Sequence, residues 1–207
     1  KKKKFRYYDS YISKVLKGIG PDSGITNNAK QQLNSVLITL SQLFSNRAVE
    51  LTEISKKRTL SMKEIENAIK TYLEGELQNH AIKQGQKSVD LYEKYDDSEK
   101  GVSRQSKAQI VFPPSITEKF LRKFDNSTIM VTQNAPVYLA SVLEYICIEI
   151  LEQSINNARS QSRVRLTVRD IELSVRNDTE INKLFSNNNI IFMGGSNIPH
   201  INPVLLH

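Results

Sequence analysis

The chain has 207 residues, of which 39% are hydrophobic and 25% are charged, so a packed core is expected and general disorder is excluded. No apolar run approaches the roughly 20 residues of a membrane span, so no membrane partner is expected. The formal charge is +7, and "KKKKFR" at residues 1–6 carries +5 of it, which leaves 7 − 5 = +2 for the remainder. The basic residues of the body must therefore act through their placement rather than through overall charge.

The first half follows a basic tail at residues 1–7 and has the periodicity of helices up to residue 95. "GPDSG" provides turn chemistry after the first helix, and Thr26 is suited to cap a long second helix. A basic loop, "KKRT", ends that helix, and Ser61 and Glu64 have the spacing of a capping box for the next one. The expected helices run from Tyr8 to Ile19, from the Thr26 cap through Ile54, through Ile65 to Tyr72, and from Glu76 to Tyr95.

The second half repeats this order after a polar linker at residues 96–107, which contains Gly101 and no periodicity. A short helix carries Ile116 and Phe120, and an irregular loop follows at residues 125–133. A long apolar helix and a basic loop, "RVR", then lead to a short helix from Arg169 to Val175. The chain therefore contains the same helical unit twice.

Each long helix has an apolar stripe too wide for its own unit to cover. Two such units can cross their long helices and bury both stripes, so we expect an all-α fold made of one fused pair. The units span residues 8–95 and 108–185, and an extended tail follows at residues 186–207. The single cysteine, Cys147, lies on the second stripe and is expected to be buried filler; it excludes an internal disulfide and suits a reducing compartment.

Motifs in both halves resemble core histones. "PDSGI", "KEIENAI" and "EGELQNHAIKQGQKSV" are similar to the two-B class. "FPPSI", "APVYLASVLEYICIEILE", "IELSVRNDTEINKL" and "GGSNIPHINPVLL" are similar to the two-A class. Both classes in one polypeptide, with the B-like half first, resemble the histone doublets of giant DNA viruses.

The resemblance implies two histone folds in one chain that form a handshake pseudo-dimer. It further implies an architectural protein that binds double-stranded DNA without base readout. Its partners would be histones of the third and fourth classes or a second histone doublet, and the product would be nucleosome-like particles that compact a viral genome. The implied location is the virion and the viral factory in the host cytoplasm, with the host nucleus as a further possibility.

A handshake would place the first loop of each half beside the second loop of the other. Each loop pair then combines a helix N-terminus with cationic side chains, an arrangement that favours phosphate. The two short first helices offer a third contact, and ordinary solvated charge remains the alternative for every cation. The DNA-binding candidates are Arg165, Arg163, Arg169, Lys57, Arg58, Thr59, Thr26, Thr167, Arg159, Lys14, Lys17, Lys119, Arg122 and Lys123.

The loop at residues 125–133 contains no Lys or Arg, although the histone family normally inserts an arginine into the minor groove there. This departure predicts a looser grip on DNA at that loop.

Acidic residues also follow a pattern. On a helical wheel Glu144, Glu149 and Glu152 lie opposite the apolar stripe and are expected to face solvent. The resemblance implies that they form an acidic patch with Glu76, Asp178 and Glu180, where basic peptides dock; ordinary amphipathic solvation is the alternative. It also implies that the tail anchors the pair to central histones through Ile198, Ile201, Val204 and Leu205; a local hydrophobic latch is the alternative.

No catalytic residue, metal site or cofactor is expected. "GG" at residues 194–195 is no phosphate loop, and His80, His200 and His207 lack ligand spacing. The alternatives to DNA packaging are a histone-fold protein-interaction module, such as a transcription-factor-like pair, and a mimic that sequesters a chromatin factor through its acidic face.

Overall fold

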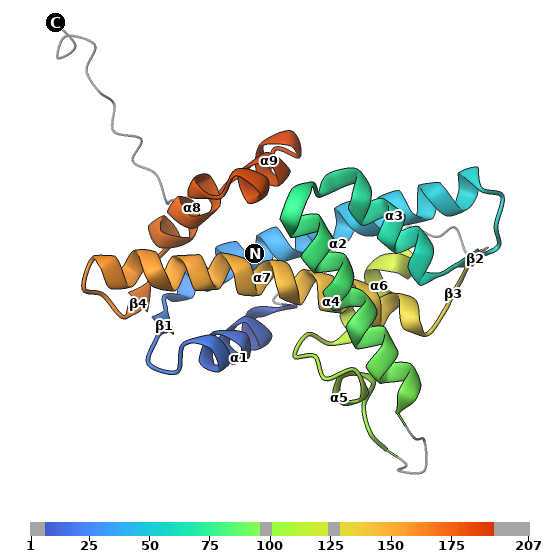
Figure 1. The fold of residues 1–207 in the computed structure, drawn as a ribbon, viewed down its shortest axis with the longest axis horizontal. Coiled ribbons are helices and arrows are strands. Elements are labelled where there is room, and N and C mark those ends of the chain that lie inside the picture. The colour runs from blue at the N-terminus through green and yellow to red at the C-terminus, as the bar shows by residue number, and fades with distance from the viewer. Residues whose placement is uncertain (1–6, 96–100, 124–128, 193–207) are drawn as a thin grey trace, which may run out of the picture.

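The computed structural model describes residues 7–95, 101–123 and 129–192, which fold into helices joined by short loops and two pairs of very short strands (Figure 1). The first half contains α1 (Asp9–Ile19), β1 (Gly24–Ile25), α2 (Asn27–Ile54), β2 (Thr59–Leu60), α3 (Met62–Tyr72) and α4 (Gly75–Lys94). The second half contains α5 (Arg104–Lys107), α6 (Pro114–Lys123), β3 (Met130–Val131), α7 (Asn134–Ser160), β4 (Arg165–Leu166), α8 (Val168–Asn177) and α9 (Thr179–Asn187).

Local capping chemistry sets the helix starts. The Thr26 side chain accepts a hydrogen bond from the backbone N–H of Ala29 at 3.3 Å and caps α2. Ser61 and Glu64 form the predicted capping box of α3, in which the backbone N–H of Ser61 donates to the Glu64 carboxylate at 2.9 Å. The Thr26 and Ser61 caps confirm the predicted beginnings of α2 and α3.

The two halves are joined by two parallel strand pairs. In each pair, a strand from the first loop of one half lies beside a strand from the second loop of the other half. β1 pairs with β4 in the register Gly24↔Arg165 and Ile25↔Leu166. β2 pairs with β3 in the register Thr59↔Met130 and Leu60↔Val131. The first loop of each half thus lies beside the second loop of the other, which confirms the handshake of two helical units.

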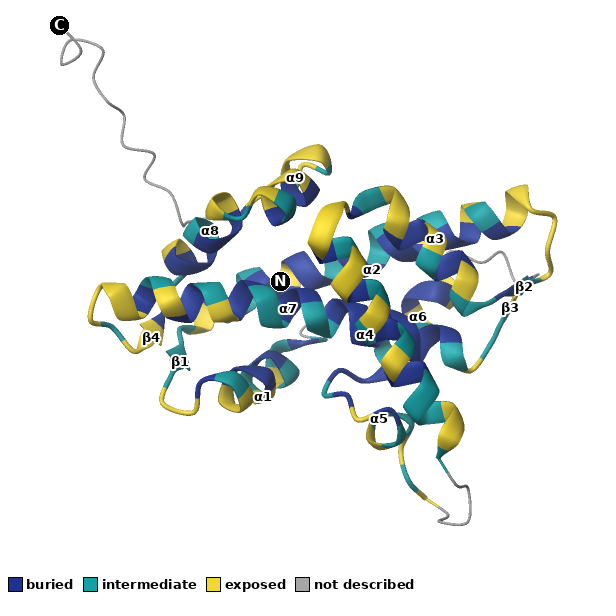
Figure 2. Cartoon of the chain, in the orientation of Figure 1, coloured by how far each residue is buried: buried dark blue, intermediate teal, exposed yellow. Residues whose placement is uncertain are grey.

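The core is organised around α7, which contacts α1, α2, α3 and α4 of the first half and α6 and α8 of the second. Sixteen of its 27 residues are buried, including Cys147, and the blue colour of buried positions runs along most of its length in Figure 2. By length and hydropathy α7 would suit a membrane span, but 72% of its apolar 18-residue window is buried inside the fold. The apolarity of α7 is therefore accounted for by core packing.

A glycine allows α4 to lie close against α7. The backbone of Gly85 is so near Tyr138 that a Cβ added at Gly85 would stand 2.8 Å from the tyrosine ring. One turn further along α4, the Ser88 and Ser141 hydroxyls are 2.8 Å apart, and the Ser141 hydroxyl donates to the Gln84 carbonyl at 3.1 Å. This contact fixes where α4 crosses the central helix.

Two boundaries differ from the sequence prediction. The segment expected to be a structureless linker ends in α5, which Arg104 ties to α6 through Glu118 at 2.5 Å. Helix α9 was not predicted separately; Asp178 caps it by accepting from the backbone N–H groups of Glu180 and Ile181. Because α9 includes Ser186 and Asn187, the extended tail cannot begin at residue 186.

We expect Gly85→Ala to lower the free energy of unfolding by about 1–3 kcal/mol, because the new methyl group would overpack a tyrosine that is fully buried. Urea denaturation followed by circular dichroism would measure the change. Gly18→Ala in α1 is the matched control, since a Cβ there meets nothing within 4 Å and should leave stability unchanged or raise it by up to about 1 kcal/mol. Equal stability of the two variants would contradict the close packing of α4 on α7.

Candidate nucleic-acid interface

The β1–β4 end presents an exposed arginine above a glycine. Arg165 begins β4 and is exposed, and a Cβ at Gly24 would lie 3.7 Å from its Cγ, so the arginine stem crosses the neighbouring strand where no side chain obstructs it. The N–H of Gly24 donates to the carbonyl of Val164, and the N–H of Thr26 donates to that of Leu166, both at 2.9 Å. These bonds place the N-terminus of α2 beside Arg165.

Two further predicted cations, Arg159 and Arg169, lie on either side of this loop and are exposed. Arg159 is in the last turn of α7, where a cation also complements the helix dipole, and Arg169 is in the first turn of α8. The structure therefore gathers the arginines at positions 159, 165 and 169 around one loop.

The β2–β3 end is built in the same way but carries different side chains. Lys57 and Arg58 are exposed before β2, and the N–H of Met130 donates to the Arg58 carbonyl at 2.8 Å. A hollow of about 360 Å³ at this end is lined by Glu53, Lys57, Arg58 and Ile129. Residues 124–128 of the loop predicted to grip DNA loosely lie outside the described residues.

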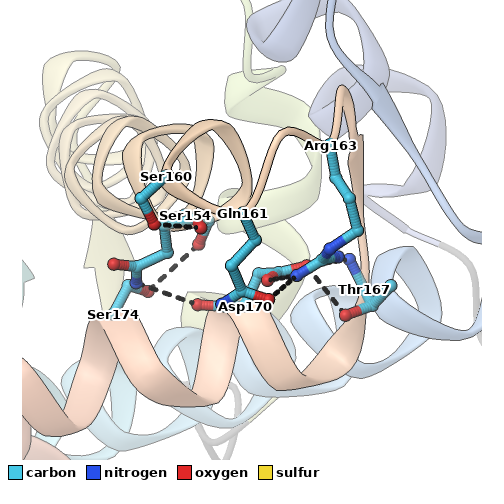
Figure 3. A network of polar contacts seen from close by, with 8 residues as sticks. Ser154, Ser160, Gln161, Arg163, Thr167, Asp170 and Ser174 are labelled. Carbon is cyan, nitrogen blue, oxygen red and sulfur yellow. Dashed lines mark hydrogen bonds and ion pairs between the residues drawn. The ribbon is translucent and has the colours of Figure 1, made fainter.

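Arg163 is held by a buried carboxylate (Figure 3). Its guanidinium donates to both oxygens of Asp170, at 2.9 and 2.6 Å, and the Asp170 side chain has no exposed surface. The same carboxylate accepts the N–H of Thr167 at 2.8 Å and the Thr167 hydroxyl at 2.8 Å. Arg163 and Thr167, two residues predicted to bind DNA, thus hold the loop against Asp170. The Arg163 side chain remains 35% exposed.

Lys57 has the equivalent role in the first half. Its ammonium lies 2.6 Å from Glu64, whose side chain is only 4% exposed. Burial alone would raise the pKa of Glu64, but hydrogen bonds from Lys57 and Ser61 outweigh it and lower the pKa to about 2. In Asp170 the opposing effect of burial is likewise outweighed by Arg163 and Thr167, which hold its pKa below the ordinary value. Each second loop is therefore fixed to its following helix by an ion pair.

A serine pair secures α8 against α7 beside this ion pair, as Figure 3 shows. The hydroxyls of Ser154 and Ser174 are 3.0 Å apart, and both donate to the carbonyl of Ile150. Gln161 accepts from the Arg163 guanidinium at 2.7 Å. The loop that carries Arg165 thus lies beside polar contacts that run from the buried Ser154, Ser174 and Asp170 to the surface at Gln161.

The short first helices carry the third group of predicted cations. Lys14 and Lys17 of α1 and Lys119 of α6 are exposed, and the Lys14 ammonium lies 5.5 Å from the Tyr11 ring centre. Lys123 is exposed at the end of α6. Lysines of the two halves thus lie on corresponding helices.

Glu118 pairs with one cation of this third group, Arg122, and the sequence analysis did not predict this pairing. Its carboxylate accepts from Arg122 at 2.9 Å and from Arg104 at 2.5 Å. Burial acts to raise the pKa of Glu118, but these two guanidiniums outweigh it and keep the pKa below its usual value. The spacing of Glu118 and Arg122 on one helix could have revealed half of this cluster, whereas Arg104 comes from α5.

The predicted acidic patch does not form as one surface, because some of its carboxylates are engaged in contacts within the chain. Glu144 was expected to face solvent, but its half-buried carboxylate accepts the backbone N–H groups of Val111 and Phe112 at 2.7 Å each, so that expectation was wrong. Burial raises the pKa of Glu144 despite these two bonds. Its carboxylate is engaged with the loop before α6 and is not available to a partner in this arrangement.

The other acidic residues gather where α4, α7 and α9 meet. Glu180 accepts the N–H groups of Glu76 and Leu77 at 2.9 and 2.6 Å, which caps α4 from the opposite half. Asp178 caps α9 and accepts from Gln153 at 2.9 Å. The remaining carboxylates, Glu76, Glu149 and Glu152, are less engaged: Glu76 and Glu152 are exposed, and Glu149 is half-buried.

The predicted docking residues Ile198, Ile201, Val204 and Leu205 lie outside the described residues, so their role stays a prediction. Near the end of the described residues, Phe185 and Phe192 stack with ring centres 5.6 Å apart, and Ile191 is 76% exposed.

Two helical units clasped through paired first and second loops, with cations at both loop pairs, define a histone-fold pair. A family model described as the core histone domain, which spans the two-A, two-B, third and fourth classes, matches residues 98–177. The chain is 30% identical to histone H2B.v1 of Dictyostelium discoideum over 93% of its own length and 90% of that protein. It is 44% identical to a two-A histone of Plasmodium falciparum over 52% of the chain and 79% of the relative.

A solved histone structure from Methanopyrus kandleri superposes with a TM-score of 0.51 over 81% of this chain and 91% of that one, at 18% identity, which supports the fold. The chain belongs to the core histone family, and its two halves form a fused doublet, two-B-like first and two-A-like second. Core histones are structural proteins rather than enzymes. Within the described residues, no group of three or more His, Cys, Asp or Glu side chains could hold a metal ion.

We expect stability to fall as the pH is lowered through the range from about 4.5 to about 2, because the Glu64 carboxylate has its ordinary pKa when unfolded and a lowered one when folded. The contribution is complete above that range and lost within it. Glu64→Gln should cost about 1–3 kcal/mol at neutral pH and flatten this acid dependence, as measured by urea unfolding at successive pH values. Glu53→Gln, which removes an exposed carboxylate, is the control; identical curves for both variants would refute the assigned role.

Proposed function

We propose that this chain is an architectural DNA-packaging protein that binds duplex DNA along one continuous surface and assembles with histones of the third and fourth classes, or with a second doublet, into nucleosome-like particles. The observation that carries the proposal is the handshake itself. It places Arg165 at one end of the fold and Arg58 at the other, each beside a helix N-terminus of the opposite half. Phosphates favour such a combination of free N–H groups and cations.

The lysines of α1 and α6 supply the middle of this surface. Binding directed at the DNA backbone requires only that these cations reach phosphates, and it requires no pocket that reads a base edge. The body of the chain is close to neutral, so its affinity depends on these local clusters and on the basic segment at residues 1–6.

The exposed carboxylates Glu76 and Glu152, together with the half-buried Glu149, support a smaller acidic patch for basic peptides than the one inferred from sequence. The virion, the viral factory and the host nucleus remain the proposed sites of action. They rest on the arrangement of a B-like half before an A-like half, which resembles viral histone doublets.

The alternative is a histone-fold module that acts through protein contacts. One observation favours it: three of the expected DNA-binding cations, Lys57, Arg122 and Arg163, are already paired with carboxylates. Salt-insensitive, weak DNA binding would support this alternative.

Reconstitution with duplex DNA and histones of the third and fourth classes should yield a discrete fragment protected from nuclease, because the proposed surface follows the DNA backbone. Deletion of residues 193–207 should reduce the yield of that fragment while leaving binding of the isolated chain to DNA unchanged. The control is an equal amount of the histone partner without this chain. Absence of a discrete fragment with several partners, from a folded chain, would favour the interaction module.

Two substitutions should change DNA affinity in opposite directions. Arg165→Ala removes one exposed cation and should lower affinity and reduce the salt slope by about 0.9. Glu118→Gln releases Arg104 and Arg122 from their carboxylate and should raise affinity and steepen the slope by up to about twice that amount.

Fluorescence anisotropy with one labelled duplex at several salt concentrations would measure both variants. Arg176→Ala is the matched control, because this exposed arginine lies on α8 away from the paired loops and pairs with Glu172. If Glu118→Gln binds no better than the parent chain, the α6 group does not contact DNA.

A further inference from the structure

Helix α4 carries a line of lysines on the side turned away from the central helix. Lys83, Lys87 and Lys94 are all exposed. At 100° per residue they fall within an arc of about 40° on the helix. Gly85 and Ser88, which pack against α7, lie on the opposite side. The three lysines are called the lysine ridge below.

Two lysines of the ridge stand at a spacing that is unfavourable within a helix. Lys83 and Lys87 are four residues apart, where like charges repel. Lys70 of the neighbouring α3 shows the favourable arrangement, since its ammonium lies 2.6 Å from the Glu66 carboxylate. Asp90, three residues after Lys87, instead accepts from a glutamine amide at 2.7 Å. No carboxylate among the described residues offsets the repulsion, so an acidic ligand would do so.

A hollow of about 360 Å³ along the ridge adds an apolar component. Leu91 is half-buried there; it lies four residues after Lys87 and three before Lys94, so the methylene stems of both lysines flank it. A ligand that fills the hollow would meet one apolar side chain bordered by ammonium groups. The lining described by the structure is Lys83, Gln86, Lys87, Asp90, Leu91 and Lys94.

The charge around the ridge favours a peptide over a DNA duplex. Glu76 lies on the same line of α4, seven residues or about 10 Å before Lys83. Glu149 is beside Tyr145, whose ring contacts His80 one turn after Glu76. A duplex is stiff over this length and would bring its phosphates to these carboxylates, within the roughly 10 Å over which 0.1 M salt screens charge. A short peptide can end before them.

We propose that the lysine ridge docks an acidic peptide segment of a partner protein, with carboxylates on the lysines and one apolar or aromatic side chain against Leu91. The ridge follows α4 where this helix crosses α7 (Figure 1). Its lysines belong neither to the loop pairs nor to the first helices of the proposed DNA surface. The inference therefore does not rest on the proposed function.

A synthetic peptide provides the test. The probe is a short fluorescein-labelled peptide of Glu and Asp with one central Phe, and fluorescence anisotropy would give its affinity for the full chain. Lys83→Ala combined with Lys87→Ala should weaken binding about fivefold to twentyfold, because two ionic contacts are lost. The matched control is Lys63→Ala with Lys70→Ala, which removes the same charge from exposed positions of α3 and should leave the peptide affinity unchanged.

The apolar contact has its own readout. Leu91→Ser should weaken binding of the Phe peptide about threefold to tenfold, because apolar contact area is lost. It should have little effect on a peptide in which Ser replaces Phe, so the two changes should not be additive. Circular dichroism would confirm the fold of every variant. The lysine substitutions keep the test decisive if Leu91→Ser unfolds the chain, since alanine is favourable at exposed helical positions.

Three outcomes would overturn the inference. Equal loss of peptide binding in the ridge and α3 variants would show attraction to positive charge of any kind. A matching loss of duplex affinity and salt slope in the ridge variant would make the ridge a nucleic-acid surface. Self-association of the parent chain in sedimentation, abolished in the ridge variant, would assign the ridge to a second copy. A chain that binds the peptide through the ridge but binds no duplex DNA would contradict the proposed function alone.

Discussion

The structure depends on the burial of α7, which neither half could achieve alone. Its first-half neighbours α1, α2, α3 and α4 and its second-half neighbours α6 and α8 together enclose an apolar surface that spans most of 27 residues. An exposed helix of this hydropathy would drive aggregation, so the two units must associate for either to be stable. Joining them in one chain makes that association intramolecular, and its strength no longer depends on protein concentration.

This reciprocal packing also positions the surface chemistry. Once α2 and α7 are fixed, each first loop meets the second loop of the other half, and two register pairs are enough to align them. Buried carboxylates then restrain the second loops, Glu64 through Lys57 and Asp170 through Arg163. Because Lys57 and Arg163 are paired with these carboxylates, they are less free to bind a ligand. The same ion pairs restrain the short loops that carry Arg58 and Arg165.

The sequence predicted the helices well where periodicity and capping agree, as they do for Thr26 with α2 and Ser61 with α3. Helix α9 was not predicted because only one residue, Asp178, separates it from α8, and the sequence prediction ended its last helix at Val175. Partners of individual side chains could not be predicted in the same way. Glu144 lies opposite the apolar stripe of α7 as expected, but only the folded chain brings the N–H groups of Val111 and Phe112 to it.

The candidate interface shows why residue type alone is a poor guide to a binding surface in a chain of this kind. Arg122 and Arg165 are equally cationic in the sequence, yet one shares a carboxylate with Arg104 and the other projects over a glycine. An arginine already satisfied by Glu118 must break a charge-assisted bond before it can bind a phosphate, so its net contribution is the difference between two similar interactions. Among the residues that the structure describes, no carboxylate pairs with Arg165 in this way. In the proposed function, a histone pair whose body is nearly neutral can therefore still bind DNA along a defined surface, because that surface is determined by which cations the fold leaves unengaged and not by how many the sequence contains.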